Sequence, residues 1–289
     1  MSGLAVAAMS GEAADVGGRR LAVAGSLTAA VAAVTVGLVA ATSPAEDASG
    51  RSAPRPSASP SQSATMPVIL SSCYVPSTPT NVSVTTEDAM ALTTLAAGVR
   101  DVERGRDRVE AAVAEAAPDD VTPEQVADAA DSLLGLRPGN QLTCSHPRLD
   151  VDPERMGRNG LTPRANTLRR AWTRVFGPII SGGFAGGGIS SGHVDGSSHY
   201  DGRAVDVFFR PLGDDEQRRR GHVFAQWLVA HAERYHVLSV IYADRIWTSW
   251  AAFFGWRDYI HPSGPTRDPV LRHLDHVHVA VESGERYRG

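Results

Sequence analysis

Two short stretches of the chain carry side chains of the kinds that bind a divalent metal ion. In the first, His199 follows a Gly/Ser-rich approach, and Asp206 lies within an apolar run typical of a buried strand. In the second, His276 and His278 belong to a run whose β-branched alternation predicts another strand. Because successive side chains of a strand point to opposite faces, these two histidines share one face, about 7 Å apart.

These side chains match the ligand set of a catalytic zinc site. His199 and His278 would supply two neutral nitrogens, and Asp206 would supply one carboxylate oxygen. Three protein ligands with one open position are typical of catalytic zinc, which lowers the pKa of its bound water to about 7. We therefore expect His276 to stand beside the open position.

The two stretches also form one longer pattern, Ser197-x-His199-x-x-Gly202-x-Ala204-x-Asp206 followed by Asp275-His276-x-His278. This pattern resembles the zinc-site signature of the D-Ala-D-Ala carboxypeptidase and hedgehog-type metallopeptidase superfamily, which includes lysostaphin-like endopeptidases. The resemblance implies an α+β fold, with a central antiparallel sheet and flanking helices, for a C-terminal domain at residues 145–289. It also implies that the substrates are peptide bonds of cell-wall peptidoglycan, often next to D-amino acids.

The resemblance further implies a role for each residue of the pattern. His199, Asp206 and His278 would bind zinc. His276 would assist the metal-bound water or stabilise an oxyanion, and Asp275 would orient His276. The implied activity is that of a zinc hydrolase, of the D,D-carboxypeptidase or endopeptidase kind.

Two features of many members of that superfamily are missing. Residues 175–202 hold no arginine that could bind a substrate carboxylate, and no glutamate stands shortly before His278. The acid–base candidates just before His278 are instead His273, Asp275 and His276. Two alternatives to a hydrolase therefore stay open: a non-catalytic zinc domain that binds wall or protein ligands, and a structural envelope protein without a physiological metal.

Five further residues are candidates for the cleft. His193, six residues before the first histidine ligand, either competes as a ligand, lines the cleft or is a polar loop residue. Tyr200 is a candidate substrate-binding residue that donates to an oxyanion, or it packs. Asp244, Arg245 and Trp247 follow a predicted strand and are candidates for the substrate groove, or they belong to the core and its loops.

The N-terminal residues predict an export or anchoring segment. Residues 21–41 are uncharged and follow Arg19 and Arg20, which end the cytoplasmic or n-region, 1–20. This length suits a transmembrane helix, but the weak hydrophobicity of the segment also suits a cleaved signal peptide; a buried soluble helix is the third alternative. A transmembrane helix or a cleaved signal peptide would each place the remaining chain outside the cytoplasm. Residues 42–72, rich in Ser, Pro and Ala, predict a disordered linker.

Residues 73–144 predict a helical hairpin. Apolar residues at a spacing of three to four predict one amphipathic helix from Thr86 to Ala116. A second helix is expected after Thr122, whose spacing to Gln125 predicts a capping box. The imperfect repeat leaves a self-associating coiled coil as the alternative.

The only two cysteines, Cys73 and Cys144, flank this hairpin. In an oxidising compartment an even number of cysteines favours a disulfide, which would join the two ends of the hairpin. Two free thiols are the alternative.

The composition places the core and the chemistry in the C-terminal half. All ten histidines fall at or after His146, and of 18 aromatic residues only Tyr74 precedes residue 150. The net charge of −4 argues against a nucleic-acid binder, which usually carries a basic surplus. We expect no nucleotide cofactor, because no phosphate-binding loop is present in the sequence.

Overall fold

The computed structural model describes residues 72–139, 141–146 and 150–284. The predicted anchor or signal segment at 21–41 lies outside these ranges, as does nearly all of the predicted linker. Within the described ranges, no helix combines the length and the apolar character needed to cross a bilayer.

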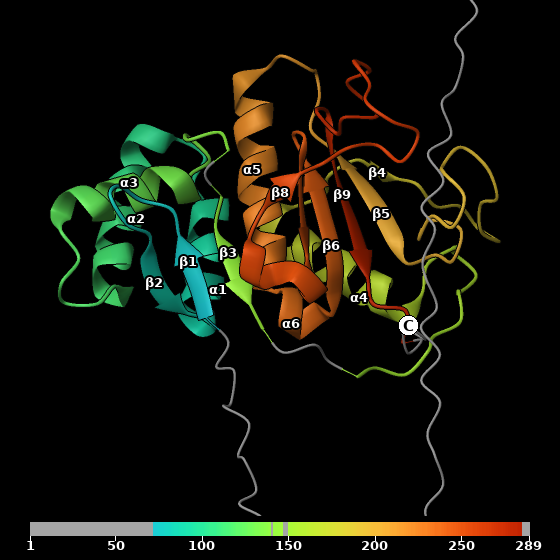
Figure 1. Cartoon of the computed structure of the whole chain (residues 1–289), viewed down its shortest axis with the longest axis horizontal. Coiled ribbons are helices and arrows are strands. Elements are labelled where there is room, and N and C mark those ends of the chain that lie inside the picture. Colours follow the sequence, from blue (N-terminus) through green and yellow to red (C-terminus); the bar gives the residue numbers. More distant parts are fainter. Residues whose placement is uncertain (1–71, 140, 147–149, 285–289) are drawn as a thin grey trace, which may run out of the picture. The chain divides into compact units, whose positions relative to one another are not determined.

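A six-stranded antiparallel sheet forms the centre of the part that follows residue 150 (Figure 1). Its strands lie in the order β4-β5-β9-β6-β7-β8. Their bounds are β4 Ser181–Gly182, β5 Ala204–Phe208, β6 Val237–Tyr242, β7 Arg245–Thr248, β8 Arg257–Asp258 and β9 His276–Val281. This antiparallel sheet, with helices beside it, confirms the prediction of an α+β fold with a central antiparallel sheet.

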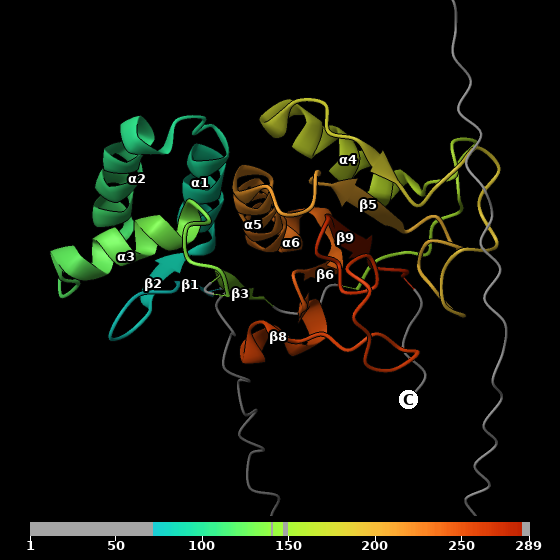
Figure 2. The ribbon, with the colours of Figure 1, turned by 90° about the horizontal axis from the view of Figure 1, so that it is seen from above.

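Three helices pack beside this sheet, and they lie on the same side of β5, β9 and β6 in Figure 2. Their bounds are α4 Pro163–Phe176, α5 Asp215–Ala230 and α6 Ala232–Tyr235. The valines of β5 and β9 are buried in the core that these helices complete. Because side chains alternate along a strand, Asp206, His276 and His278 lie on the opposite face of the sheet.

Aromatic side chains join α4 to α5. Trp172 and Phe176 of α4 meet Phe224 and Trp227 of α5 edge to face, with ring centroids 5.0–5.9 Å apart. Edge-to-face pairs of this kind add about 0.5–1.5 kcal/mol each beyond the burial of their surface. This packing fixes the helical layer against which the two central strands are held.

The segment predicted as a hairpin contains three helices. Their bounds are α1 Thr86–Ala97, α2 Val102–Ala116 and α3 Pro123–Leu133. The start of α3 is confirmed, because Thr122 and Gln125 form both hydrogen bonds of a capping box. The prediction of one continuous helix over residues 86–116 is wrong, because α1 ends at Gly98 and Asp101 caps a new helix.

Packing at the break explains why the helix does not continue. Val99 lies in the break and folds over Gly105 of α2, where an added Cβ atom would stand 2.5 Å from the Val99 side chain. Asp101 accepts a hydrogen bond from the backbone N–H of Arg104, which satisfies one of the free donors at the start of α2. A buried apolar contact and a cap therefore override the helical periodicity.

A second, three-stranded antiparallel sheet holds the ends of this helical part together. Its order is β2-β1-β3, with bounds β1 Ser72–Val75, β2 Val82–Thr85 and β3 Thr143–Ser145. Cys73 of β1 lies directly opposite Cys144 of β3, and the two buried cysteines form a disulfide. The predicted disulfide is therefore confirmed.

Candidate metal centre

Three elements bring the predicted ligands together. Asp206 on β5 lies directly opposite His278 on β9 in the strand register, so their side chains are neighbours on one face. His199 reaches them from the turn that precedes β5, which closes with a hydrogen bond from the N–H of Gly202 to the carbonyl of His199. Gly202 has a φ of +66°, and an added Cβ atom would lie 2.6 Å from the Gly160 carbonyl oxygen, so only glycine fits this bend.

The three donor atoms form a nearly equilateral triangle. His199 Nε2 lies 3.0 Å from His278 Nδ1 and 3.2 Å from Asp206 Oδ1, and the last two atoms are 3.1 Å apart. A tetrahedral zinc ion with bonds of 2.0–2.1 Å has ligand atoms about 3.3 Å apart. The donor set and its dimensions therefore fit a small divalent metal ion bound at one face of the triangle.

Hydrogen bonding prepares His199 to act as a ligand. Its Nδ1 lies 2.8 Å from the carbonyl oxygen of Gly183, so Nδ1 carries the proton and Nε2 presents a lone pair to the other donors. Gly183 has a φ of +78°, and an added Cβ atom would lie 2.4 Å from the His199 ring. Glycine at this position lets the backbone carbonyl approach the ring.

The electrostatics of the site favour the protonation states that metal binding requires. Burial would raise the pKa of Asp206, but hydrogen bonds and charge from His199 and His278 outweigh it and hold this pKa well below its usual range. Burial lowers the pKa of His278, against the opposing effect of the Asp206 carboxylate. At neutral pH the Asp206 carboxylate is therefore ionised, and the lowered pKa of His278 favours its neutral form; these are the forms that coordinate metals.

His276 is oriented by a carboxylate that an arginine holds in turn. Its Nδ1 lies 2.8 Å from Asp275 Oδ1, while Arg210 Nε donates to Asp275 Oδ2 over 2.7 Å. The other ring nitrogen, Nε2, lies 3.8 Å from Asp206 Oδ1, at the edge of the triangle of donors. The sequence did not identify Arg210 as a site residue. Only the pairing of β5 with β9 shows that the residues after β5 reach Asp275.

His193 also approaches the cluster, as the sequence analysis allowed. His193, His199 and Asp206 each offer a donor atom within 4.8 Å of the others, so this group could hold a metal ion. The His193 ring, however, stacks on the His199 ring with centroids 3.9 Å apart and planes 20° from parallel. Because a metal ion lies near the plane of an imidazole that binds it, two stacked rings do not point at one ion. His278 therefore fits the third position better than His193.

Tyr200 is engaged with the loop that carries His193. Its hydroxyl donates to the backbone carbonyl of His193 over 2.5 Å and accepts from the His193 N–H over 3.0 Å. These two bonds hold the loop against the cluster. The structure therefore gives Tyr200 a loop-holding contact, in line with the packing alternative, and its contact with an oxyanion stays a prediction.

His273 is buried beside the cluster. Its ring centroid lies 4.6 Å from that of His276 and 5.8 Å from that of His278. Burial and the neighbouring histidines lower its pKa to about 3, so it is neutral at physiological pH. His273 therefore adds a third imidazole to the face that holds His276 and His278.

The predicted groove residues after β6 have other partners. Trp247 is fully buried on the core side of β7, which contradicts the prediction that it lines a groove and confirms the alternative that it belongs to the core. Arg245 binds Asp258 over 2.6 Å and donates to a backbone carbonyl. Asp244 forms an ion pair with Arg272, next to His273 in the chain, and so holds the segment that carries this buried histidine.

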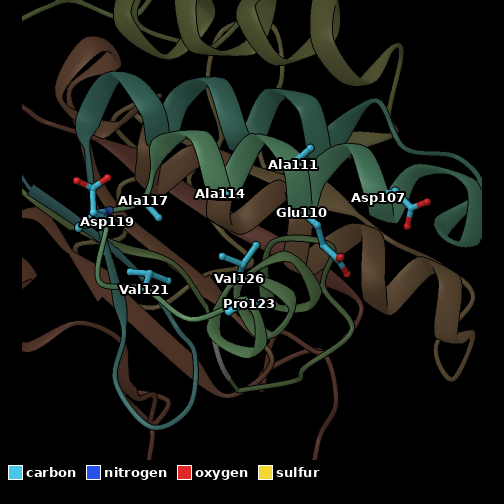
Figure 3. Close-up of a pocket in the computed structure, with 10 residues that line it drawn as sticks. Asp107, Glu110, Ala111, Ala114, Ala117, Asp119, Val121, Pro123 and Val126 are labelled. Atoms are coloured by element: carbon cyan, nitrogen blue, oxygen red, sulfur yellow. The ribbon is translucent and has the colours of Figure 1, made fainter.

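A separate hollow of about 580 Å³ lies between α2 and α3 (Figure 3). Alanines of α2 and Val126 of α3 line it, with Asp107 and Glu110 at its rim. Its lining includes none of the residues of the metal cluster. The chemistry of the cluster therefore does not extend into this hollow.

The comparisons with known proteins bear on the part of the chain that holds the cluster. Neither the curated proteins nor the solved structures yielded a match. The family model that does match spans residues 157–270 and so includes His199 and Asp206 but ends before His276. Over that range the chain is similar to the family described as VldE, C-terminal domain, which is related to the zinc peptidases that the motif resembles.

Proposed function

We propose that the chain is a zinc-dependent hydrolase that acts outside the cytoplasm on peptide bonds of peptidoglycan. The observation that carries this proposal is the triangle of His199, Asp206 and His278 donor atoms, 3.0–3.2 Å apart, with an oriented histidine at its edge. Two histidines and one carboxylate are a ligand set of catalytic rather than structural zinc sites.

Zinc bound at this triangle would polarise a substrate carbonyl and lower the pKa of water to about 7. The chain's own residues would do the rest. His276 Nε2 faces the cluster and would accept a proton during attack and return it to the departing amine. Asp275 accepts from His276 Nδ1 and stabilises the protonated ring, and Arg210 keeps that carboxylate in place.

Three sequence features support the location and the substrate class. The uncharged segment at 21–41 predicts export or anchoring, and the disulfide suits an oxidising compartment. The spaced motif resembles a superfamily whose usual substrates are peptidoglycan peptides. Residues 175–202 hold no arginine to bind a substrate carboxylate, so the proposal covers both carboxypeptidase and endopeptidase cleavage.

Digestion of defined stem peptides, followed by mass spectrometry of the products, tests this proposal. We expect His276→Ala to lower turnover by about 10²–10⁴-fold, the usual contribution of a general acid–base group. Elemental analysis should find the same zinc content in this variant, because His276 is not part of the donor triangle. Zinc-loaded chain that releases no amine from any peptide would refute the hydrolase and favour the non-catalytic zinc domain. Chain that purifies without metal and binds none would refute both.

A further inference from the structure

Three aromatic side chains are exposed on one short helical turn. The turn is η1, Ser249–Phe254, between β7 and β8, and the exposed fractions of Trp250, Phe253 and Phe254 are 63, 88 and 73%. We call these three residues the η1 patch. The Phe253 and Phe254 rings are in contact, with centroids 5.7 Å apart, and large exposed apolar groups that gather within one short segment mark interaction surfaces more often than scattered ones do.

The η1 patch lies close to the point where the N-terminal segment joins the fold. Gly255, at the end of η1, packs near Thr143 of β3, and the Trp256 indole donates to the Leu142 carbonyl over 2.9 Å. At the other end of β3, Ser145 is hydrogen-bonded to Ser72, the first described residue. Figures 1 and 2 both show the orange turn that follows β7 beside β3.

We propose that the η1 patch lies in the interfacial layer of the membrane to which residues 21–41 anchor the chain. This inference rests on the anchoring alternative for residues 21–41 in the proposed function and not on hydrolysis. As the flexible linker that their composition predicts, residues 42–72 would have a root-mean-square span of about 30 Å, which would bring the bilayer within reach of the fold. The chain enters the fold beside the patch, so a short tether would bring this surface to the membrane first.

The chemistry of the η1 patch suits a bilayer surface. Tryptophan is enriched at membrane–water interfaces, and phenylalanine side chains bury into the acyl boundary. The Arg257 guanidinium lies 5.1 Å from the Trp250 ring, where it would meet anionic head groups. Phe253 and Phe254 meet edge to face at 82°, so they do not form the flat platform on which a sugar ring stacks.

The tryptophans of the chain provide a selective probe. Trp250 is exposed, whereas Trp172, Trp227, Trp247 and Trp256 are at most 9% exposed. The test uses the full chain in phospholipid vesicles that carry bromine at shallow acyl positions, because an interfacial group sits about 5–10 Å deep. Subtraction of the Trp250→Phe spectrum isolates the emission of Trp250.

We expect shallow bromines to remove most of the Trp250 emission and aqueous acrylamide to remove little of it. In the double variant Phe253→Ser and Phe254→Ser, we expect acrylamide to remove most of the Trp250 emission and the bromines to remove little of it. Ile180→Ser is the matched control, because Ile180 is 78% exposed but lies beside β4, at the other edge of the sheet; it should change neither result.

Each other outcome overturns the proposal in a distinct way. If the chain floats with the vesicles but acrylamide quenches Trp250, the chain is anchored and the η1 patch lies in water. Quenching by neither agent means that protein covers the patch, and light scattering then tells a second copy from a segment of the same chain. A change in Trp250 emission on addition of soluble wall glycan, without lipid quenching, assigns the patch to sugars. Chain that does not float refutes the anchor as well, whether or not the chain cleaves stem peptides.

Discussion

The choice between His193 and His278 as a metal ligand depends on ring orientation. His278 presents Nδ1 to both His199 and Asp206 at 3.0–3.1 Å, whereas His193 lies flat against the His199 ring. Both histidines are near the cluster, so proximity does not separate them. The direction of the ring plane does, because it decides where the nitrogen lone pair points.

This geometry predicts different metal affinities for two alanine variants. His278→Ala should weaken zinc binding by at least about 100-fold, more than the loss of an outer partner typically costs. His193→Ala, the matched control in the same cluster, should change it by less than about tenfold. Competition with a chromophoric chelator measures both. A larger loss in His193→Ala than in His278→Ala would reverse the assignment.

A second prediction concerns a histidine far from the metal cluster. His222 of α5 is buried and hydrogen-bonded to Gln141, and burial followed by the charge of Arg218 lowers its pKa from 6.5 to about 4. The unfolded chain therefore takes up a proton as the pH falls through 6.5, whereas the folded chain does so only near pH 4. The contribution of neutral His222 to the free energy of unfolding is therefore complete above pH 6.5. About 3 kcal/mol of this free energy is lost as the pH falls to 4.

Urea unfolding of the wild-type chain and of His222→Gln between pH 7 and pH 4 measures this contribution. We expect the unfolding free energy of the variant to fall less steeply over this window, because glutamine does not titrate. Parallel curves for the two proteins would contradict the prediction.

At the scale of elements, the sequence predicted best where a local signal agrees with the packing. The Thr122 capping box and the alternation in β9 are such signals, and both correspond to the elements in the structure. The three-stranded sheet was not predicted, because strands of three or four residues are too short to show alternation. The face of β7 that carries Trp247 depends on which neighbours cover it, and local sequence does not contain that information.

The residues of the candidate site likewise divide into those that local sequence predicted and those that it did not. Asp206 and His278 follow from residue type and strand periodicity, and the register of β5 with β9 then brings them together. Arg210 and the stacking of His193 on His199 depend on contacts between segments distant in the chain. No spacing rule reveals such contacts from a single sequence.

The break between α1 and α2 leads to a prediction in which packing opposes helix propensity. Replacing a helical glycine with alanine usually stabilises a helix by about 1 kcal/mol. In Gly105→Ala the new methyl group would meet Val99 at 2.5 Å, so we expect destabilisation of about 1–3 kcal/mol. Urea unfolding measures the change. Val99→Ala combined with Gly105→Ala should recover part of the loss, and a stabilised single variant would show that Val99 moves aside freely.

At the scale of the whole molecule, the disulfide closes a long loop. Cys73 and Cys144 are 71 residues apart, and closing a loop of this length restricts the unfolded chain by about 4 kcal/mol in the chain-entropy description. We expect Cys73→Ala combined with Cys144→Ala to lower the unfolding free energy by about that amount in the absence of reductant. Added reductant should lower the stability of the wild-type chain similarly and leave the double variant unchanged. Equal stability of the two proteins without reductant would contradict the prediction.

The position of that bond also determines how the fold would respond to mechanical load. A chain fixed at its N-terminal end receives tension at Ser72, one residue before Cys73. The covalent link transmits this tension straight to Cys144 and onward to the sheet that bears the histidines, so residues 74–143 are shielded from it. A pulling force that would unfold these helices in a chain without the disulfide would leave them folded here. Reduction of the disulfide would expose the helices to that force.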